Sequence, residues 1–425
     1  MKKLLLCLLV AWLVACGGAE TDLSTYNLPE SVEVTFNVLL PETSPVNEPA
    51  VFAILDEVTG LAFNPQHMEM DRSGESSYSV SVRVPTGTLL KYRYARQTAA
   101  GNVDEIDAGG QPVLFRAFLV DGPGHVAHDL IAAWADLPTT RETGQVSGSV
   151  TESGSGNVFA NIVVVVAGKQ TRTDVDGRFV ITGLPEGLQN IVAYAEDGTQ
   201  LPFQQGALVA ANSDTPANLQ LLPNLMAEVF FIFAPPEDHT AGVPIYVAGN
   251  IGQLAGKPAL AALPDGRYGV TLQLPTGVDI RYKYTLGDGF WNAEHDAEGA
   301  FLVRQLIIPA GTTHLTIEDQ SLAWTSEATA PIWFQLTAPD PGGPVYIQFK
   351  LLDWGLALPM WPLGAGNWAY KLYSPTNFSA PLEYRYCLDA ACSILEAAPG
   401  LPRAAQGNQA SVQIIEDRVD AWQGQ

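Results

Sequence analysis

The feature that most constrains the fold of this chain is an internal repeat. The segment Tyr78 to Gln97 shares seven of its twenty positions with Tyr268 to Gly287, at a constant offset of 190 residues. A third copy, Trp368 to Asp389, carries the same Tyr-basic-Tyr triplet, which begins 102 residues after that of the second copy. Three similar copies along one chain predict three similar folding units rather than one large domain.

Each copy has the pattern of a β-unit. Apolar and polar residues alternate, as at Val80, Val82 and Val84, and no stretch has the 3.6-residue period of a long amphipathic helix. Strands of this kind in units of about 100 residues predict antiparallel sandwiches. Each copy continues to an arginine and a closing tryptophan: Arg116 and Trp134, Arg304 and Trp324, Arg403 and Trp422. We expect these tryptophans, and Trp368, to be buried.

A different segment, Gly144 to Leu222, separates the first two copies. It contains a Thr-Asp, a Gly-x-Phe and a Leu-Pro-x-Gly pattern, at Thr173, Asp174, Gly177, Phe179, Leu184, Pro185 and Gly187. This pattern resembles the carboxypeptidase regulatory-like domain, a small prealbumin-type sandwich that usually serves as a spacer. Asp174 and Asp176 could suggest a calcium loop, but the acidic residue that should close such a loop is missing. A tight turn between strands is the better interpretation.

The predicted fold class is therefore all-β, with four tandem antiparallel β-sandwiches of the immunoglobulin-like or prealbumin-like kind after a signal peptide. The predicted parts are a signal peptide at 1–15, a lipidated tether at 16–30, unit 1 at 31–137, the spacer at 144–222, unit 2 at 226–325 and unit 3 at 331–425.

The N-terminus has the layout of a secretory signal. Lys2 and Lys3 precede an apolar run from Leu4 to Ala15 that is too short to span a bilayer. The sequence then reads Ala-Cys-Gly and resembles the lipobox of bacterial lipoproteins, which implies that Cys16 is acylated and becomes the first mature residue. An ordinary signal peptide with an incidental cysteine is the alternative. The resemblance implies a lipid-anchored protein of the cell envelope that faces the periplasm or the exterior.

Two further cysteines remain after processing, Cys387 and Cys392. They stand five residues apart across a predicted turn, and an exported, oxidising setting favours a local disulfide between them. A metal site would need more ligands, and no histidine follows Ala391. We therefore predict a structural role, with no metal and no cofactor.

The charge of the chain excludes several partners. It has 22 basic and 45 acidic residues, a formal net charge of −23. Nucleic acid and anionic lipid headgroups bind clustered Lys and Arg, so neither is expected as a partner, and only the lipid anchor would hold the chain to a membrane.

The repeated units resemble the starch-binding domain, the family 20 carbohydrate-binding module, or a close sandwich relative of it. Unit 2 carries this resemblance most clearly, in the Gly-Asn-Ile and leucine of Tyr246 to Leu254, in the Leu-Pro-x-Gly pattern and in the Tyr-Lys-Tyr triplet. The matching positions are Leu274, Pro275, Gly277, Tyr282, Lys283, Tyr284, Arg304 and Trp324. Across three units the resemblance covers roughly 300 of the 425 residues.

The family's glucan site uses two tryptophans and the lysine of the triplet, but no unit here has the full set. The residues that the resemblance assigns to binding are Lys283 and Trp291 in unit 2, Trp354, Trp361 and Arg385 in unit 3, and Phe63 and Arg93 in unit 1. For Trp291 and Trp354, ligand contact and packing are equally compatible with the sequence. For Lys283 a solvated strand position between inward tyrosines is slightly favoured.

An enzyme is the rival hypothesis. Glu294, Asp296 and Glu298 cluster near His295, and glycoside hydrolysis needs two facing carboxylates. They stand in one predicted loop, where a solvated turn or a weak cation site fits better than an acid–base pair. No Gly-x-Ser-x-Gly, His-Glu-x-x-His or phosphate-loop motif occurs in the sequence.

The sequence therefore predicts a non-catalytic envelope lipoprotein that binds a polysaccharide, an α-glucan above all, with any glycoside hydrolase on a separate chain. A divergent site for a different polysaccharide is equally allowed. The alternatives are a structural or protein-binding envelope component and, less favoured, an unrecognised hydrolase.

Overall fold

The computed structural model describes residues 26–55, 57–58, 61–62, 66–138, 142–237, 239, 242–287, 293–296, 302–324, 332–350, 354, 357–372, 381–389, 391–397, 402–406 and 413–424. The predicted signal peptide, Cys16, Phe63, Trp291 and Glu298 lie outside these residues. The described part of the chain is built from strands, and its one helical segment is a short 3-10 turn. No helix in it is long and apolar enough to cross a membrane.

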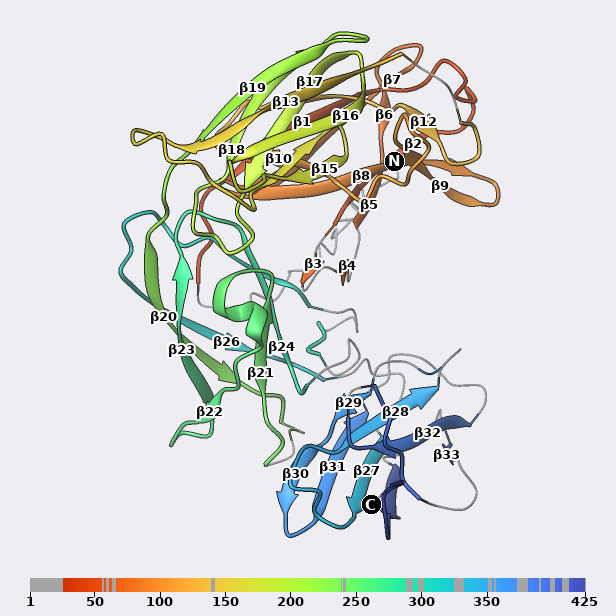
Figure 1. Ribbon diagram of the computed structural model, residues 1–425, viewed down its shortest axis with the longest axis vertical. Coiled ribbons are helices and arrows are strands. Elements are labelled where there is room, and N and C mark those ends of the chain that lie inside the picture. Colours follow the sequence, from red (N-terminus) through yellow and green to blue (C-terminus); the bar gives the residue numbers. More distant parts are fainter. Residues whose placement is uncertain are drawn as a thin grey trace, which may run out of the picture.

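The strands form four pairs of sheets, which confirms an all-β fold of tandem sandwiches (Figure 1). In unit 1 a sheet ordered β11-β1-β7-β6 faces one ordered β12-β9-β8-β2-β5, in which β10 also pairs with β8, and β3 and β4 make a separate hairpin. The strands are β1 (Ser31–Leu39), β2 (Ala50–Ile54), β3 (Glu57–Val58), β4 (Leu61–Ala62), β5 (Gln66–Glu69), β6 (Asp71–Arg72), β7 (Ser77–Pro85), β8 (Leu89–Thr98), β9 (Gly101–Ile106), β10 (Arg116–Leu119), β11 (Val126–Leu130) and β12 (Ala133–Trp134).

The spacer has sheets ordered β16-β13-β19 and β15-β14-β17-β18. Its strands are β13 (Thr143–Glu152), β14 (Val163–Val166), β15 (Lys169–Arg172), β16 (Arg178–Pro185), β17 (Gly187–Tyr194), β18 (Phe203–Val209) and β19 (Asp214–Leu221). The predicted tight turn is present, because the Asp174 carboxylate accepts the N–H groups of Asp176 and Arg178, and Gly177 has φ +70°.

Unit 2 has sheets ordered β22-β23-β20-β26 and β21-β24-β25, and unit 3 has β30-β31-β27-β34 and β29-β28-β32-β33. The elements of unit 2 are β20 (Met226–Ala234), β21 (Tyr246–Gly249), η1 (Gly252–Gly256), β22 (Ala261–Ala262), β23 (Tyr268–Pro275), β24 (Ile280–Thr285), β25 (Arg304–Leu306) and β26 (His314–Gln320). Those of unit 3 are β27 (Ile332–Thr337), β28 (Tyr346–Lys350), β29 (Leu358–Pro359), β30 (Trp361–Gly364), β31 (Asn367–Leu372), β32 (Leu382–Cys387), β33 (Arg403–Ala405) and β34 (Gln413–Arg418).

One strand pair in each sandwich differs from the antiparallel prediction. The first and last long strands of a sandwich run parallel: β1 with β11, β13 with β19, β20 with β26 and β27 with β34. A parallel pair needs a long crossover, and here most or all strands of the opposite sheet lie between the two strands in sequence. The other pairs between described strands are antiparallel, so each sandwich is mixed rather than purely antiparallel.

The cores follow from the alternation in the sequence. In β20, Ala227, Val229, Phe231 and Phe233 are fully buried, whereas Glu228 between them is exposed. The closing tryptophans Trp134, Trp324 and Trp422 are at most 2% exposed and Trp368 is 5% exposed, which confirms their predicted burial.

Unit 1 and the spacer share a packed junction. Lys169 Nζ donates to Asp107 Oδ2 at 2.7 Å, and the Leu119 N–H donates to Gln204 Oε1 at 2.7 Å. A small core forms there around Ala117 of unit 1 and the valines of β14. Hydrogen bonds and apolar packing occur in the same junction, so the two sandwiches lie directly against each other (Figure 1).

Unit 3 contacts unit 2 through Trp361. Its indole N–H donates to the Leu286 carbonyl at 2.8 Å, its ring stacks on Tyr370, and its side chain belongs to the core cluster of unit 2. Trp361 is 3% exposed. The prediction that it contacts a ligand therefore differs from the structure, in which the indole fills the junction between two units.

Candidate functional site

The three repeated units contain the same buried polar network, which fixes where their outward residues lie. In unit 2, Tyr282 and Tyr284 of β24 donate their hydroxyl groups to Asp319 Oδ2, at 2.9 and 2.8 Å. Arg304 of β25 bridges Asp319 Oδ1 at 3.2 Å and Glu294 Oε2 at 2.7 Å. Glu294 also accepts the backbone N–H of Tyr284 at 2.9 Å.

The equivalent groups in the other units make the same bonds. They are Tyr92, Tyr94, Glu105, Arg116 and Asp129 in unit 1, and Tyr384, Tyr386, Glu396, Arg403 and Asp417 in unit 3. We call each set a tyrosine–arginine network. Burial and the aspartate charge raise the pKa of Tyr282 and Tyr284 well above the usual value, so both hydroxyl groups stay protonated and act as donors.

This network corrects the expectation for the carboxylate cluster. Glu294 is fully buried, and it holds Arg304 rather than standing in a solvated turn. Burial raises its pKa, while the Arg304 guanidinium opposes that rise. A carboxylate enclosed by its own ion pair has no access to substrate, so Glu294 cannot serve as one half of a glycosidase pair. Among the described residues, no group of three or more His, Cys, Asp or Glu side chains is arranged to hold a metal ion.

The middle residue of each Tyr-basic-Tyr triplet points away from the network, and the three units place it differently. Arg93 is 32% exposed, and its Nη1 lies 3.6 Å from Asp104 Oδ2. A surface ion pair of this kind contributes little to stability. Lys283 is 6% exposed, which differs from the solvated position favoured by the sequence. Burial, together with the charge of Lys257, lowers its pKa to about 8, and Glu294 opposes the shift.

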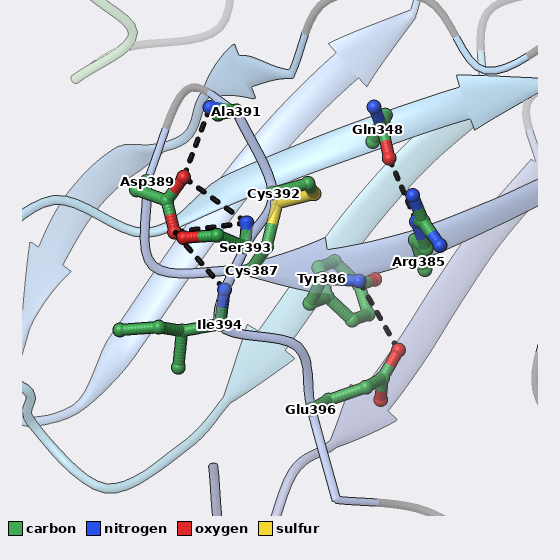
Figure 2. The surroundings of a disulfide bond; sticks show 10 residues. All are labelled: Gln348, Arg385, Tyr386, Cys387, Asp389, Ala391, Cys392, Ser393, Ile394 and Glu396. Atoms are coloured by element: carbon green, nitrogen blue, oxygen red, sulfur yellow. Dashed lines mark hydrogen bonds between the residues drawn. A yellow bond between two sulfur atoms is a disulfide. The ribbon is translucent and has the colours of Figure 1, made fainter. Parts of the chain in front are cut away.

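In unit 3 the middle residue meets a candidate tryptophan. The Arg385 guanidinium carbon lies 4.1 Å from the centroid of the Trp354 ring, although the two residues are 31 positions apart. Arg385 Nε donates to Gln348 Oε1 at 2.7 Å, across the β28–β32 pair (Figure 2). The indole is partly exposed. Two of the residues predicted from the resemblance are thus brought together on one sheet face.

The rest of this face supplies hydrogen-bonding groups. Lys350 and Glu383, opposite each other on β28 and β32, form a half-exposed ion pair of 2.7 Å. We call Trp354, Arg385, Gln348, Lys350 and Glu383 the Trp354 surface. An indole beside charged and amide groups offers a flat apolar face together with donors and acceptors, the combination that a pyranose ring and its hydroxyl groups require.

The predicted disulfide between Cys387 and Cys392 is present beside this surface, with a Cα–Cα distance of 5.2 Å. The loop that it closes is also held by Asp389, whose carboxylate accepts the N–H groups of Ala391, Ser393 and Ile394 (Figure 2). The disulfide lies at the end of β32, one residue after Tyr386, so it fixes the strand that carries Arg385.

Comparison with known proteins gives a partial likeness. No protein-family profile matches the chain. An amylopullulanase from Thermoanaerobacter thermohydrosulfuricus is 30% identical over 115 residues, a stretch that covers 25% of this chain and 7% of the amylopullulanase. The chain thus spans a small fraction of the length of that relative.

Solved structures resemble the chain only loosely. The TIE protein of Bacillus anthracis is 11% identical, with 93% of this chain and 69% of that chain covered and a TM-score of 0.20. A streptococcal ancillary pilin is 12% identical, with 68% and 99% covered and a TM-score of 0.22. At such TM-scores the likeness carries no argument about function.

Proposed function

We propose that this chain is a non-catalytic protein of the cell envelope that binds a polysaccharide, with an α-glucan as the leading ligand class. The observation that carries the proposal is the contact of Trp354 with Arg385 on the outer face of unit 3. The guanidinium lies over the centre of the partly exposed indole and holds it in place, so little side-chain freedom is lost when a sugar binds to the ring. The likeness of part of the chain to an amylopullulanase supports the same ligand class.

The proposal includes an anchor and a division of the chain. Residues 1–15 would be removed on export, Cys16 would carry the lipid, and units 1, 2 and 3 and the spacer would keep the boundaries given by the sequence. A lipid-held chain of several modules would keep polysaccharide near the cell, where a separate glycoside hydrolase could act on it. Several weak sites on one chain raise the overall affinity by increasing the effective concentration.

Affinity electrophoresis of the purified chain, in native gels that contain starch or pullulan, tests the proposal. Retardation of the wild-type protein is expected, and Trp354→Ala should weaken it about thirtyfold, equivalent to about 2 kcal/mol for an aromatic anchor. Phe230→Ala is the matched control, since Phe230 is also a partly buried aromatic side chain, on β20 of unit 2 and away from the Trp354 surface. This control should migrate like the wild type.

A second pair of variants separates the effect of a lost charge on gel mobility from the effect of a lost contact with the sugar. Arg385→Ala removes one positive charge from the Trp354 surface, and Arg418→Ala removes one from a side chain that is 78% exposed on β34. Both alter the net charge equally, so only a loss of binding distinguishes them in the gel. Unchanged mobility of the wild type in every polysaccharide would contradict the proposal.

A structural role is the second candidate, and the junctions between units favour it. Trp361 is buried between units 2 and 3, and polar contacts tie unit 1 to the spacer. Such joints suit a stiff stalk that positions another envelope component. This role would be the better account if no polysaccharide retards the chain, whereas release of sugar by the purified chain would instead identify a hydrolase.

A further inference from the structure

A cleft lies where unit 1, the spacer and unit 2 meet, on the part of the molecule away from the Trp354 surface. Its volume is about 720 Å³, within the roughly 300–1,000 Å³ that is usual for ligand sites. Unit 1 contributes the start of β8, and unit 2 contributes η1 and the start of β24. The spacer contributes residues from two segments, 159–162 and 194–202. Three separate modules therefore form one concave surface.

The walls of the cleft are held at fixed distances by contacts between the modules. Gln305 of unit 2 donates to Thr88 Oγ1 of unit 1 at 2.9 Å. Asn224 Nδ2, after the last strand of the spacer, donates to the carbonyl groups of Gly198 and Thr276, at 3.0 and 2.6 Å. Unit 1 and the spacer are joined by the contacts described above. All three pairs of modules are thus fastened, and the cleft is a built feature rather than a gap at a hinge.

The charges that line the cleft nearly cancel. Two basic and three acidic side chains contribute, and Arg281 is already paired with Asp279 at 3.1 Å. Gln305 donates to the same Asp279 at 2.8 Å, so this carboxylate is held by two partners. A phosphorylated or strongly acidic ligand would need an excess of cations, which the lining does not offer.

The uncharged part of the lining is mixed. Tyr194 and Phe159 supply aromatic surface, and Asn161, Asn250 and Thr199 supply amide and hydroxyl groups. Asn250 is held by the Arg281 N–H, which donates to its Oδ1 at 2.9 Å. A lining with interleaved aromatic and polar groups suits a hydroxyl-rich, uncharged chain better than a lipid, which would need a continuous apolar wall.

We infer that this cleft is a second binding site, and that its ligand is a segment of a neutral oligosaccharide chain. The site uses three modules at once, so it exists only in the assembled chain and not in any isolated sandwich. It does not depend on the Trp354 surface, although both are assigned to the same class of ligand.

Occlusion of the cleft tests the inference. Ala255 is exposed, lines the cleft and follows Leu254 in η1, so Ala255→Trp places a bulky ring in the opening without removing a buried contact. Ala262→Trp is the matched control, because Ala262 is exposed in the same unit on β22 and does not line the cleft. The measurement is isothermal titration of the full chain with maltoheptaose and with cellohexaose, with circular dichroism to verify that each variant is folded.

Two classes of binding site are expected for at least one of the two probes. Ala255→Trp should lower the affinity of one class of site at least tenfold and leave the affinity of the other class unchanged. Trp354→Ala should have the opposite effect on the two classes, and Ala262→Trp should bind like the wild type. If Trp354→Ala abolishes all binding and Ala255→Trp changes nothing, the cleft assignment is wrong while the proposed function stands. If only Ala255→Trp abolishes binding, the cleft stands and the Trp354 surface does not. No binding of either probe to the wild type overturns the cleft assignment.

Discussion

The tyrosine–arginine network makes a quantitative prediction for the variant Arg304→Met. In unit 2 the Arg304 side chain is 6% exposed, and its partners Glu294 and Asp319 are both 0% exposed. Removal of the guanidinium leaves two carboxylates buried without their cation. Breaking a buried ion pair from one side costs about 3–5 kcal/mol, so unit 2 should lose a large part of the roughly 5–15 kcal/mol that a module of this size has.

The same substitution in unit 3 provides the internal comparison. Arg403 is 21% exposed and Asp417 is 12% exposed, although Glu396 is fully buried. Water can therefore reach part of this network and solvate the carboxylates after the substitution. We expect Arg403→Met to cost about 1–3 kcal/mol, less than Arg304→Met, because the desolvation penalty decreases with exposure.

Hydrogen exchange of the full chain, followed by mass spectrometry, is the appropriate assay. A protein of several modules has no single free energy of unfolding, but exchange measures opening segment by segment. Amides of β24 and β25 should exchange roughly 10²- to 10³-fold faster or more in Arg304→Met, whereas those of β13 to β19 should be unchanged. Addition of Glu294→Gln and Asp319→Asn to Arg304→Met should restore part of the protection, since the network then holds no buried charge.

Two results would refute this reasoning. Equal losses of amide protection in Arg304→Met and Arg403→Met would show that burial does not determine how much the network stabilises its unit. No recovery in the triple variant would show that the loss comes from the missing side-chain volume of Arg304 and not from uncompensated charge.

Three further predictions follow from local geometry. Lys283 has a folded pKa of about 8 against a usual 10.5, so the unfolded state binds the extra proton between these values. Protection of unit 2 should therefore rise by about 1–2 kcal/mol from pH 8 to pH 9.5, below the usual tyrosine pKa near 10, above which ionisation of Tyr282 and Tyr284 in the unfolded state opposes the rise. Lys283→Met should remove the rise, which hydrogen exchange at several pH values would detect. Replacement of both Cys387 and Cys392 by serine should lower the free energy of unfolding of unit 3 by about 2 kcal/mol, since the closed loop is short. A larger decrease, measured by chemical unfolding, would contradict a purely local role of the disulfide. At Gly198, with φ +71°, an added Cβ would lie 2.5 Å from Pro275 Cγ. Gly198→Ala should therefore loosen the joint between the spacer and unit 2 and widen the distribution of molecular shapes in small-angle scattering. An unchanged distribution would count against this prediction.

The repeat predicted much of the fold because its signal is local. Alternation of apolar residues determines which face of a strand is buried, so the all-β architecture, the buried tryptophans and the turn at Asp174 could be predicted without knowledge of the neighbours of each strand. The disulfide was predictable for the same reason, as its two cysteines are five residues apart. The parallel pairing of β1 with β11 was not, because it depends on how the two sheets are connected.

The network carboxylates had a signal that the sequence interpretation missed. Glu105, Glu294 and Glu396 follow the second tyrosine of their triplets by 11, 10 and 10 residues. Alignment of the three copies between the Tyr-basic-Tyr triplet and the following arginine would have shown these glutamates to be equivalent. Glu294 would then have been assigned to the core of its unit and not to a solvated loop.

The placement of Trp361 and the cleft could not be predicted from the sequence by any such alignment. Trp361 is buried by Leu286 and its neighbours in another module, and the cleft combines the start of β8 with η1, which are more than 150 residues apart in the chain. Such features depend on how the modules dock, and docking depends on shape over whole surfaces rather than on a periodic pattern.

The network also explains how one fold can carry three different outer surfaces. Arg93, Lys283 and Arg385 occupy the same position between two tyrosines, and the tyrosines on each side are fixed by the buried aspartate and arginine. The backbone at this position is therefore held from inside the sandwich, so the fold does not depend on which side chain stands there. It can form a surface ion pair in unit 1, be buried in unit 2 and lie against a tryptophan in unit 3. Exchange of Arg385 for lysine should therefore leave the protection of unit 3 unchanged and weaken sugar binding, because lysine keeps the charge but loses the planar contact with Trp354.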